Sequence, residues 1–257
     1  MRATRTRHFL TVSACALTAL SVASAAWSSD LSALSDVERD AFRGEVRAYL
    51  LENPEVLMEA IAVLEERNAQ SAEISDRNLI AANADALFTS PSDLVLGNPD
   101  GDITIVEFLD YRCGYCKKAH PDVKALLEND GNIRLIIKEF PILGEASVLA
   151  SRFAIATHLV GGDAAYSEVY EALMTAGNNV SKASLKRLLR GTDIDTDAVM
   201  ARMDTQEVTD IIAKNHALGQ EMQINGTPAF VMETELVRGY VPYDSMVEIV
   251  ADLRAKG

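Results

Sequence analysis

The sequence predicts an α/β protein that carries an inserted block of helices and is preceded by a helical extension. Two short apolar runs at 103–109 and 133–140 flank a helical stretch, which is the pattern of a strand–helix–strand unit. Residues 145–223 read as helical throughout, and strand patterns return after them. Residues 35–90 carry helical periodicity and no strand signal, so they form a separate helical region.

The beginning of the chain is typical of a secretory signal peptide. Three arginines precede an uncharged stretch from Phe9 to Ser29, and Ala23-Ser24-Ala25 fits the small-x-small pattern of a cleavage site. We therefore expect residues 1–25 to be removed on export through the Sec pathway to the periplasm. An uncleaved anchor helix is one alternative, and a lipoprotein signal at Cys15 is another.

Composition and charge restrict the class of protein. With 257 residues, 48% of them apolar, the chain is long enough to bury a sizeable core. The formal net charge of −14 repels phosphate backbones, so we expect no nucleic-acid partner. Three cysteines are too few for a disulfide-stapled scaffold, and removal of the signal peptide would leave only Cys113 and Cys116 as a pair.

The extension, residues 26–90, is predicted to contain at least two amphipathic helices. Ser35-Asp36-Val37-Glu38 is a capping box that begins the first helix. Asn53-Pro54 ends that helix and begins the next. Because the apolar stripes of these helices must bury against something, we predict a homo-oligomer that assembles through residues 35–90. Docking of the helices on their own domain is the alternative.

Residues 91–257 form the α/β part. Turn-rich clusters precede the strand at 103–109. Cys113-Gly114-Tyr115-Cys116 follows, with a helix from Cys116 to about residue 128 and the strand at 133–140. The helical insertion then occupies residues 145–223, with breaks expected at Gly161-Gly162, at Gly177-Asn178-Asn179 and at Gly191-Thr192-Asp193.

The last part of the chain returns to strands. Gly226-Thr227-Pro228 precedes a predicted strand at 229–232, and a second strand is expected at 236–238. A helix over about 243–256 completes the α/β part.

The two cysteines lie where a strand meets a helix, and this placement favours redox chemistry. Cys113 at the start of the helix would be held as a thiolate by free N–H groups and the helix dipole. A thiolate attacks disulfides, and Cys116, one turn inside the helix, would resolve the resulting mixed disulfide. Disulfide exchange by two thiols needs no cofactor, so we expect none.

A Cys-x-x-Cys pair has three other common uses. Cys113, Cys116 and His120 offer three ligands for zinc, but structural zinc usually takes four. A c-type haem site is rejected because Lys117, not histidine, follows the second cysteine. An inert disulfide would close a very small loop and would stabilise the fold little.

The sequence resembles the DsbA-like branch of the thioredoxin superfamily. The resemblance rests on the strand that ends in Glu107-Phe108, the Tyr111-Arg112-Cys113-Gly114-Tyr115-Cys116 segment, the helical insertion and Gly226-Thr227-Pro228-Ala229-Phe230-Val231. The segment Tyr49–Leu57 is similar to the helical extension of ScsC-type secreted proteins. The resemblance covers about residues 38–255 and implies a thioredoxin fold.

The resemblance also implies roles for particular residues. It implies a cis peptide bond at Thr227-Pro228 that faces the cysteines, with the backbone before the proline pairing with substrate. Glu107 matches the buried acid that handles the proton of the second cysteine, and a partly solvated strand-end acid is the alternative. Tyr115 is a candidate substrate contact, and Lys138 is expected to face solvent rather than to join this network.

The dipeptide between the cysteines bears on the kind of activity. Gly114-Tyr115 differs from the Pro-His of strongly oxidising DsbA proteins and matches the dipeptide common in disulfide isomerases, as does Thr227 before the proline. We therefore favour isomerase or reductase activity on cysteine-containing proteins, with a membrane thiol reductant as the implied partner. A DsbA-type oxidase is one alternative, and a copper handler that binds Cu(I) through both thiols is another.

Overall fold

The structure is a computed structural model, and it describes residues 34–177 and 179–256. The predicted signal peptide and Cys15 lie outside the described residues. The chain divides into two compact units between Ala62 and Val63, and each is described by itself. Within the described residues, none of the helices combines the length and the apolar character needed to cross a membrane.

The smaller unit consists of α1 (Asp36–Glu52) and the beginning of α2 (Glu55–Ala82). The predicted capping box is present, because the Ser35 hydroxyl accepts the Glu38 N–H and the Glu38 carboxylate accepts the Ser35 N–H at 2.9 Å. Asn53 ends α1 by donating its N–H to the carbonyl of Tyr49. Pro54 lies between the helices, where its missing N–H costs little.

The apolar stripes of this unit are exposed. The exposed fractions are 49% for Phe42, 41% for Val46 and 54% for Tyr49 on α1, and 48% for Leu57 and 47% for Ile61 on α2. No residue of α1 is buried. The stripes therefore leave substantial apolar surface in contact with water in a single chain.

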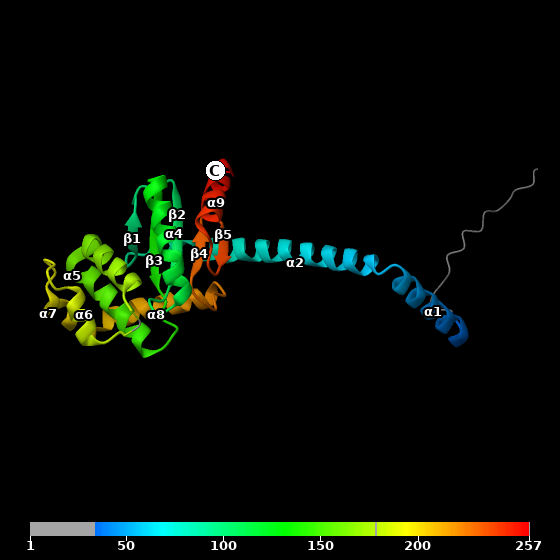
Figure 1. The fold of residues 1–257 in the computed structure, drawn as a ribbon, viewed down its shortest axis with the longest axis horizontal. Coiled ribbons are helices and arrows are strands. Elements are labelled where there is room, and N and C mark those ends of the chain that lie inside the picture. Colours follow the sequence, from blue (N-terminus) through cyan, green and yellow to red (C-terminus); the bar gives the residue numbers. More distant parts are fainter. Residues whose placement is uncertain (1–33, 178, 257) are drawn as a thin grey trace, which may run out of the picture. The chain divides into compact units, whose positions relative to one another are not determined.

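The larger unit is built on a five-stranded sheet (Figure 1). Its strands are β1 (Leu94–Gly97), β2 (Ile103–Leu109), β3 (Ile133–Glu139), β4 (Ala229–Met232) and β5 (Glu235–Arg238). They lie in the order β1-β3-β2-β4-β5, with β2 and β3 parallel and the remaining pairs antiparallel. The central strands β2 and β3 are buried on both faces, which explains their nearly continuous apolar runs.

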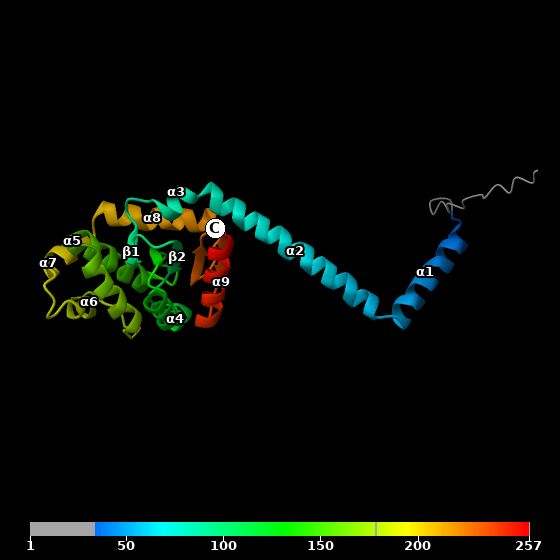
Figure 2. The ribbon, with the colours of Figure 1, turned by 90° about the horizontal axis from the view of Figure 1, so that it is seen from above.

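Helices cover both faces of the sheet (Figure 2). One face carries α4 (Gly114–Asp130) and α9 (Tyr243–Lys256), and the other carries α3 (Ala84–Phe88) and α8 (Gln206–Glu221). The helical insertion comprises α5 (Glu145–Thr175), α6 (Lys182–Leu188), α7 (Thr196–Arg202) and α8. Within α5 the chain bends at Gly162, whose φ of 73° suits glycine, in agreement with the predicted break at Gly161-Gly162.

Part of the predicted extension belongs to the larger unit. Ile80 in α2 and Leu87 in α3 are buried in the core on the α3 and α8 face of the sheet. Arg238 on β5 donates to both carboxylate oxygens of Asp76 on α2 at 2.8 Å. Residues 63–90 therefore pack as part of the larger unit.

Alternation along β2 and β3 separates two cores. Ile105 and Leu109 point into the core that contains both cysteines, whereas Phe108 and Ile136 point to the opposite face. Glu107 follows the parity of Ile105 and Leu109, so it faces the cysteine side of the sheet.

Lys138 corrects the prediction of a solvent-facing lysine. It is 3% exposed and lies on the face away from Glu107, paired with the buried carboxylate of Asp93. Its Nζ also donates to the carbonyl of Ala86 in α3 at 2.8 Å. The sheet's alternation turns Lys138 inward, and a buried carboxylate with a free helix carbonyl compensates its charge.

Candidate active site

A tight loop after β2 delivers Cys113 to the start of α4. Cys113 occupies the N-cap position of α4 with an extended backbone, and its N–H donates to the Asp110 carbonyl at 2.9 Å. The buried Asp110 carboxylate accepts the N–H groups of Arg112, Ile142 and Leu143 at 2.8, 2.9 and 2.9 Å. Asp110 thus ties the loop before the cysteines to the loop after β3.

The environment of Cys113 favours its thiolate. The Cys116 side chain, then the Thr227 side chain and the N–H groups of Cys116 and Tyr115 stabilise the anion, and together they lower the pKa of Cys113 to about 5, although burial acts against them. The Cys113 residue is 8% exposed, and its Sγ lies 3.1 Å from the carbonyl oxygen of Thr227. At neutral pH this thiol is therefore ionised and able to attack.

The environment of Cys116 has the opposite effect. Cys116 is fully buried, and burial, followed by its hydrogen bond to Cys113 and the charge of Glu107, raises its pKa far above the ordinary value. Neither cysteine is part of a disulfide in this structure. The pair therefore combines an anionic outer sulfur with a protonated inner one.

Glu107 lies beneath the pair as a fully buried carboxyl. Burial raises the pKa of Glu107 to about 8, and the charges of Glu139 and Cys113 contribute in the same direction, while the nearby Tyr170 hydroxyl lowers it. A carboxyl of this pKa exchanges protons near neutral pH. The structure thus places Glu107 in the buried position and not in the partly solvated one.

Glu139 is another buried acid, and sequence reasoning missed it. Its Oε1 accepts hydrogen bonds from the hydroxyls of Tyr111 at 2.6 Å and Tyr166 at 3.1 Å. Burial raises the pKa of Glu139 to about 8, against the effect of these hydrogen bonds. Glu139 is the last residue of β3 and pairs with Leu109, the last residue of the parallel strand β2. It therefore lies next to the loop that follows β2.

The Thr227-Pro228 peptide bond is cis, as the resemblance implies. The Pro228 carbonyl accepts the N–H of Gly239 at 2.9 Å, whereas the Thr227 carbonyl faces Cys113. Pro228 comes directly before β4, where its missing donor does not interrupt the sheet. The structure thus brings Thr227 and Pro228 to the cysteine pair from a segment far along the chain.

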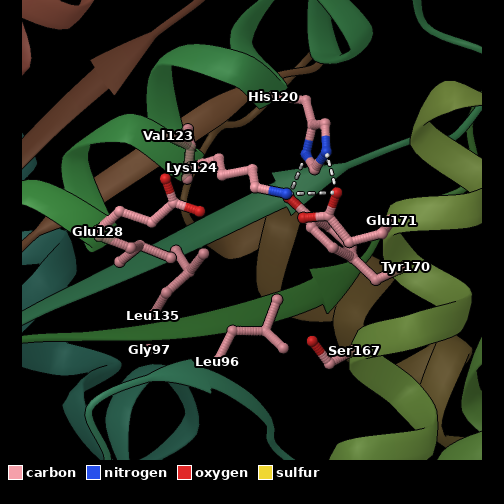
Figure 3. A pocket seen from close by; sticks show the side chains of 11 residues that line it. Leu96, Gly97, His120, Val123, Lys124, Glu128, Leu135, Ser167, Tyr170 and Glu171 are labelled. Atoms are coloured by element: carbon pink, nitrogen blue, oxygen red, sulfur yellow. Dashed lines mark hydrogen bonds and ion pairs between the residues drawn. The ribbon is translucent and has the colours of Figure 1, made fainter.

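Tyr115 and His120 take different positions around this centre. Tyr115 is 63% exposed at the start of α4, next to Cys116. His120 is buried one turn further along α4 and pairs with Glu171 of α5 (Figure 3). Cys113, Cys116 and His120 do not form a zinc site here, since the described part of the chain contains no group of three such side chains placed to hold a metal ion.

The fold and the dithiol centre define a thioredoxin-fold protein with an inserted helical block. The model of the DSBA-like thioredoxin domain matches residues 104–251, which is more than half of the chain. The model of the copper resistance protein ScsC N-terminal domain matches residues 38–71. The chain belongs to the DsbA-like thioredoxin family, as its motifs indicated.

Solved structures show the same relationship. A thioredoxin-like oxidoreductase from Silicibacter pomeroyi is 40% identical, with 67% of this chain and 98% of that chain covered and a TM-score of 0.61. A linker-deletion variant of ScsC from Proteus mirabilis is 27% identical and covers 88% and 99% of the two chains, with a TM-score of 0.65. BcfH from Salmonella enterica Typhimurium is 29% identical, with coverages of 86% and 97% and a TM-score of 0.70.

The curated relatives differ in length from this chain. A Na⁺/H⁺ antiporter of Salinispora tropica is 26% identical over 59% of this chain, and the match spans only 23% of that relative. The match to a second antiporter, from Salinispora arenicola, spans 21% of its length. Disulfide bond formation protein D of Bacillus subtilis is 25% identical, with 61% of this chain and 74% of that protein covered.

Proposed function

We propose that this protein exchanges disulfides with cysteine-containing proteins through Cys113 and Cys116, chiefly as an isomerase or reductase. The observation that carries the proposal is the position of the Cys113 sulfur at the N-cap of α4, 3.1 Å from the carbonyl oxygen of Thr227, where its surroundings lower its pKa to about 5. A backbone carbonyl at this distance is positioned to align an extended substrate segment beside the attacking sulfur. Tyr115, exposed next to the pair, offers an apolar contact to the same segment.

The reaction begins at Cys113. Its thiolate attacks a substrate disulfide, so that one sulfur–sulfur bond forms to Cys113 and the other substrate sulfur leaves as a thiolate. In isomerisation, that thiolate attacks a different disulfide of the substrate, and Cys113 is finally displaced unchanged. In reduction, Cys116 attacks the mixed disulfide, the Cys113–Cys116 bond forms, and the substrate leaves with both electrons.

Glu107 acts in the resolving step by taking the proton of Cys116. While Cys113 is a thiolate, its charge raises the pKa of Glu107. Formation of the mixed disulfide removes that charge, so Glu107 then loses its proton more readily and is ready to accept another. The protonation of Glu107 thereby depends on whether the Cys113 sulfur is a thiolate or part of a disulfide.

Two observations favour different directions of transfer. The Gly114-Tyr115 dipeptide and Thr227 favour isomerase or reductase activity. The lowered pKa of Cys113 stabilises the reduced form, which favours a DsbA-type oxidase as the second candidate. The reduction potential separates them, because DsbA lies near about −120 mV and protein disulfide isomerase near about −180 mV.

A refolding assay tests the proposal itself. Reduced full-length protein should restore activity to scrambled ribonuclease, and the Cys113→Ala variant should not. Glu248→Gln, an exposed change on α9, is the matched control and should keep full activity. Refolding by Cys113→Ala at the wild-type rate would contradict the assignment, whereas tight Cu(I) binding without any disulfide exchange would favour the copper-handling alternative.

We further propose that the exposed stripes of the smaller unit bind a second copy of the chain. Phe42, Val46, Leu50, Leu51 and Leu57 line a mostly apolar hollow of about 420 Å³ between α1 and α2. Helices with such exposed stripes associate with one another to remove apolar surface from water. An oligomer would present several dithiol sites to one misfolded substrate, which suits an isomerase.

Light scattering on the full-length protein tests this association. Phe42→Gln combined with Val46→Gln should lower the particle mass to that of one chain, while Glu45→Gln on the same helix should not. A monomeric wild-type protein, or an unchanged mass in the double variant, would contradict the proposal.

The predicted signal peptide supports a periplasmic location, in which an isomerase needs a supply of electrons to stay reduced. We propose a membrane thiol reductant as that partner. In membranes, the Cys113 thiolate of the Cys116→Ala variant should attack the oxidised, disulfide form of this partner, and the mixed disulfide to a membrane protein should persist because Cys116 is missing. Release by reductant would identify the link as a disulfide.

A further inference from the structure

Three segments meet at one edge of the sheet, around Cys113. β2 and β3 are parallel, so the loops that follow them leave at the same edge, and the antiparallel strand β4 begins there. The strand order β3-β2-β4 places the loop that carries Cys113 in the middle. The Thr227-Pro228 segment lies on its β4 side, and the loop 140–144 lies on its β3 side. The loop 140–144 is therefore a neighbour of the Cys113 loop on the side away from Thr227.

The loop 140–144 presents two apolar side chains to water. Ile142 is 37% exposed and Leu143 is 46% exposed, whereas Pro141 before them is buried. Single exposed apolar side chains are common on proteins, but contiguous apolar surface marks sites of interaction. Tyr115, exposed at the start of α4, adds an aromatic ring at the same edge of the sheet. This edge thus offers aliphatic and aromatic surface around one reactive sulfur.

The Asp110 carboxyl fixes the backbone of this loop. The residue is 0% exposed, and its Oδ2 accepts the N–H groups of both Ile142 and Leu143 at 2.9 Å. Its Oδ1 accepts the Arg112 N–H at 2.8 Å, and its main-chain carbonyl accepts the Cys113 N–H at 2.9 Å. One residue therefore holds both the turn before the nucleophile and the loop beside it.

Arg112 makes another link between the two loops. Its Nη1 donates to the Leu143 carbonyl at 3.1 Å, so the N–H and the C=O of Leu143 are both bound by residues of the Cys113 loop. A loop outside the sheet would otherwise leave these groups to water and would move more freely. The two links therefore hold the side chains of Ile142 and Leu143 in a defined place beside Cys113.

We propose that Asp110 positions Ile142 and Leu143 to bind apolar side chains that flank the cysteine of a substrate segment. Arg112 supports the same arrangement. This inference rests on the proposed thiol exchange and names its substrate class: polypeptides whose cysteines lie among aliphatic or aromatic residues. Such cysteines belong in the core of a correctly folded protein and are exposed in a misfolded one. Asp110 touches neither the substrate nor the sulfur, so it is a positioning residue.

Attack on defined mixed disulfides tests this preference. Each probe joins a coloured aromatic thiol to a second thiol, which is a peptide cysteine flanked by leucines, the same cysteine flanked by serines, or mercaptoethanol as the reference. The Cys113 thiolate attacks the aliphatic sulfur, the bond to the aromatic sulfur breaks, and the departing aromatic thiolate is followed by stopped flow. With reduced full-length protein, the leucine peptide should react faster than the serine peptide on the order of tenfold.

Removal of the apolar side chains should remove the preference. Ile142→Ser combined with Leu143→Ser should react with both peptides at similar rates. Division by the rate with the mercaptoethanol probe cancels any change in the reactivity of Cys113 itself. Val247→Ser is the matched control and should keep the wild-type preference, because Val247 is 39% exposed on α9 and lies by Asn129 at the far end of α4.

Asp110→Ala tests the positioning role, because it removes both acceptor oxygens from the loops. It should lower the normalised rate with the leucine peptide several-fold. Arg112→Gln, which breaks the link to the Leu143 carbonyl, should lower it in the same way and decides the test if Asp110→Ala does not fold. Addition of Ile142→Ser and Leu143→Ser to either variant should lower the rate little further, since both changes remove the same contact.

The outcomes separate this inference from the proposed function. Equal wild-type rates with the leucine and serine peptides would overturn the inference alone, and so would a full leucine preference in the Asp110→Ala and Arg112→Gln variants. An Asp110→Ala variant that slows with all three probes by the same factor would overturn the positioning role. A wild-type protein that attacks none of the probes would overturn the thiol exchange and this inference together.

Discussion

The sulfur of Cys113 lies 3.1 Å from the carbonyl oxygen of Thr227, although 114 positions separate the two residues in the chain. The loop before α4 and the cis peptide before β4 meet because β2 and β4 are antiparallel neighbours, with Phe108 opposite Ala229. The pairing of β2 with β4 therefore holds the Cys113 loop next to the Thr227-Pro228 segment.

Replacement of the inner cysteine should trap substrates. In Cys116→Ala the Cys113 thiolate still attacks, but no thiol remains in place to resolve the mixed disulfide. Mixed disulfides with substrate proteins should therefore accumulate several-fold over the wild type, as seen on non-reducing gels. The double variant Cys113→Ala/Cys116→Ala is the control and should trap none, and an equal amount of trapped protein would argue against attack by Cys113.

Removal of the buried acid beneath the pair should slow resolution and not attack. Glu107→Gln keeps the shape of the side chain but cannot take the Cys116 proton. General acid–base catalysis contributes about 100-fold or more, so we expect the resolving step to slow by at least about tenfold. Quenching the reaction at short times and following the disappearance of the mixed disulfide measures the rate of this step. An unchanged rate would remove Glu107 from the mechanism.

The buried carboxyl of Glu139 should make stability depend on pH. The pKa of Glu139 is about 8 in the folded protein and near 4.5 when exposed, so between these values the folded state binds more protons than the unfolded state. Stability therefore falls as the pH rises from about 4.5 and levels off above about 8, where Glu139 is ionised in both states.

Glu139→Gln keeps an acceptor for Tyr111 and Tyr166 and removes the ionisation. Relative to the wild type, this variant should gain at least about 1 kcal/mol in unfolding free energy between pH 5 and pH 9, as measured by urea titration. A constant difference between the two proteins at both pH values would contradict the assignment.

Loss of the buried lysine on the other face should affect stability alone. Lys138→Met leaves the Asp93 carboxylate buried without its partner, a change that costs about 3–5 kcal/mol. The double variant Lys138→Met/Asp93→Asn should recover part of that loss in urea unfolding. Exchange activity per folded molecule should stay at the wild-type level, and a large loss of activity would place Lys138 in the proton network after all.

Local patterns were sufficient to predict much of this protein. The capping box at Ser35, the strand–helix–strand unit around Cys113 and the break at Gly162 depend on neighbours in sequence, and all three are present. The role of Glu107 came from the family resemblance, and the structure shows that its carboxyl is buried. These features require no knowledge of which strands pair.

Other features depend on pairing across the fold. Glu139 and Tyr111 meet only because β2 and β3 run parallel in one particular register. Lys138 turns inward because Asp93, just before β1, compensates it, and no spacing in the sequence announces that partner. The same holds for Tyr170 and His120, which approach each other only when α5 of the insertion packs on α4. Sequence reasoning could place each residue on its element but not the elements against one another.

A titration of the Cys113 thiol in the reduced full-length protein tests the central claim most directly. Thiolate absorbance in the ultraviolet, corrected with the Cys113→Ala variant, should show a pKa near 5, because Cys116, Thr227 and the first N–H groups of α4 stabilise the anion. A pKa near the ordinary value of 9.0 would contradict the account, since Cys113 would then be mostly protonated at neutral pH.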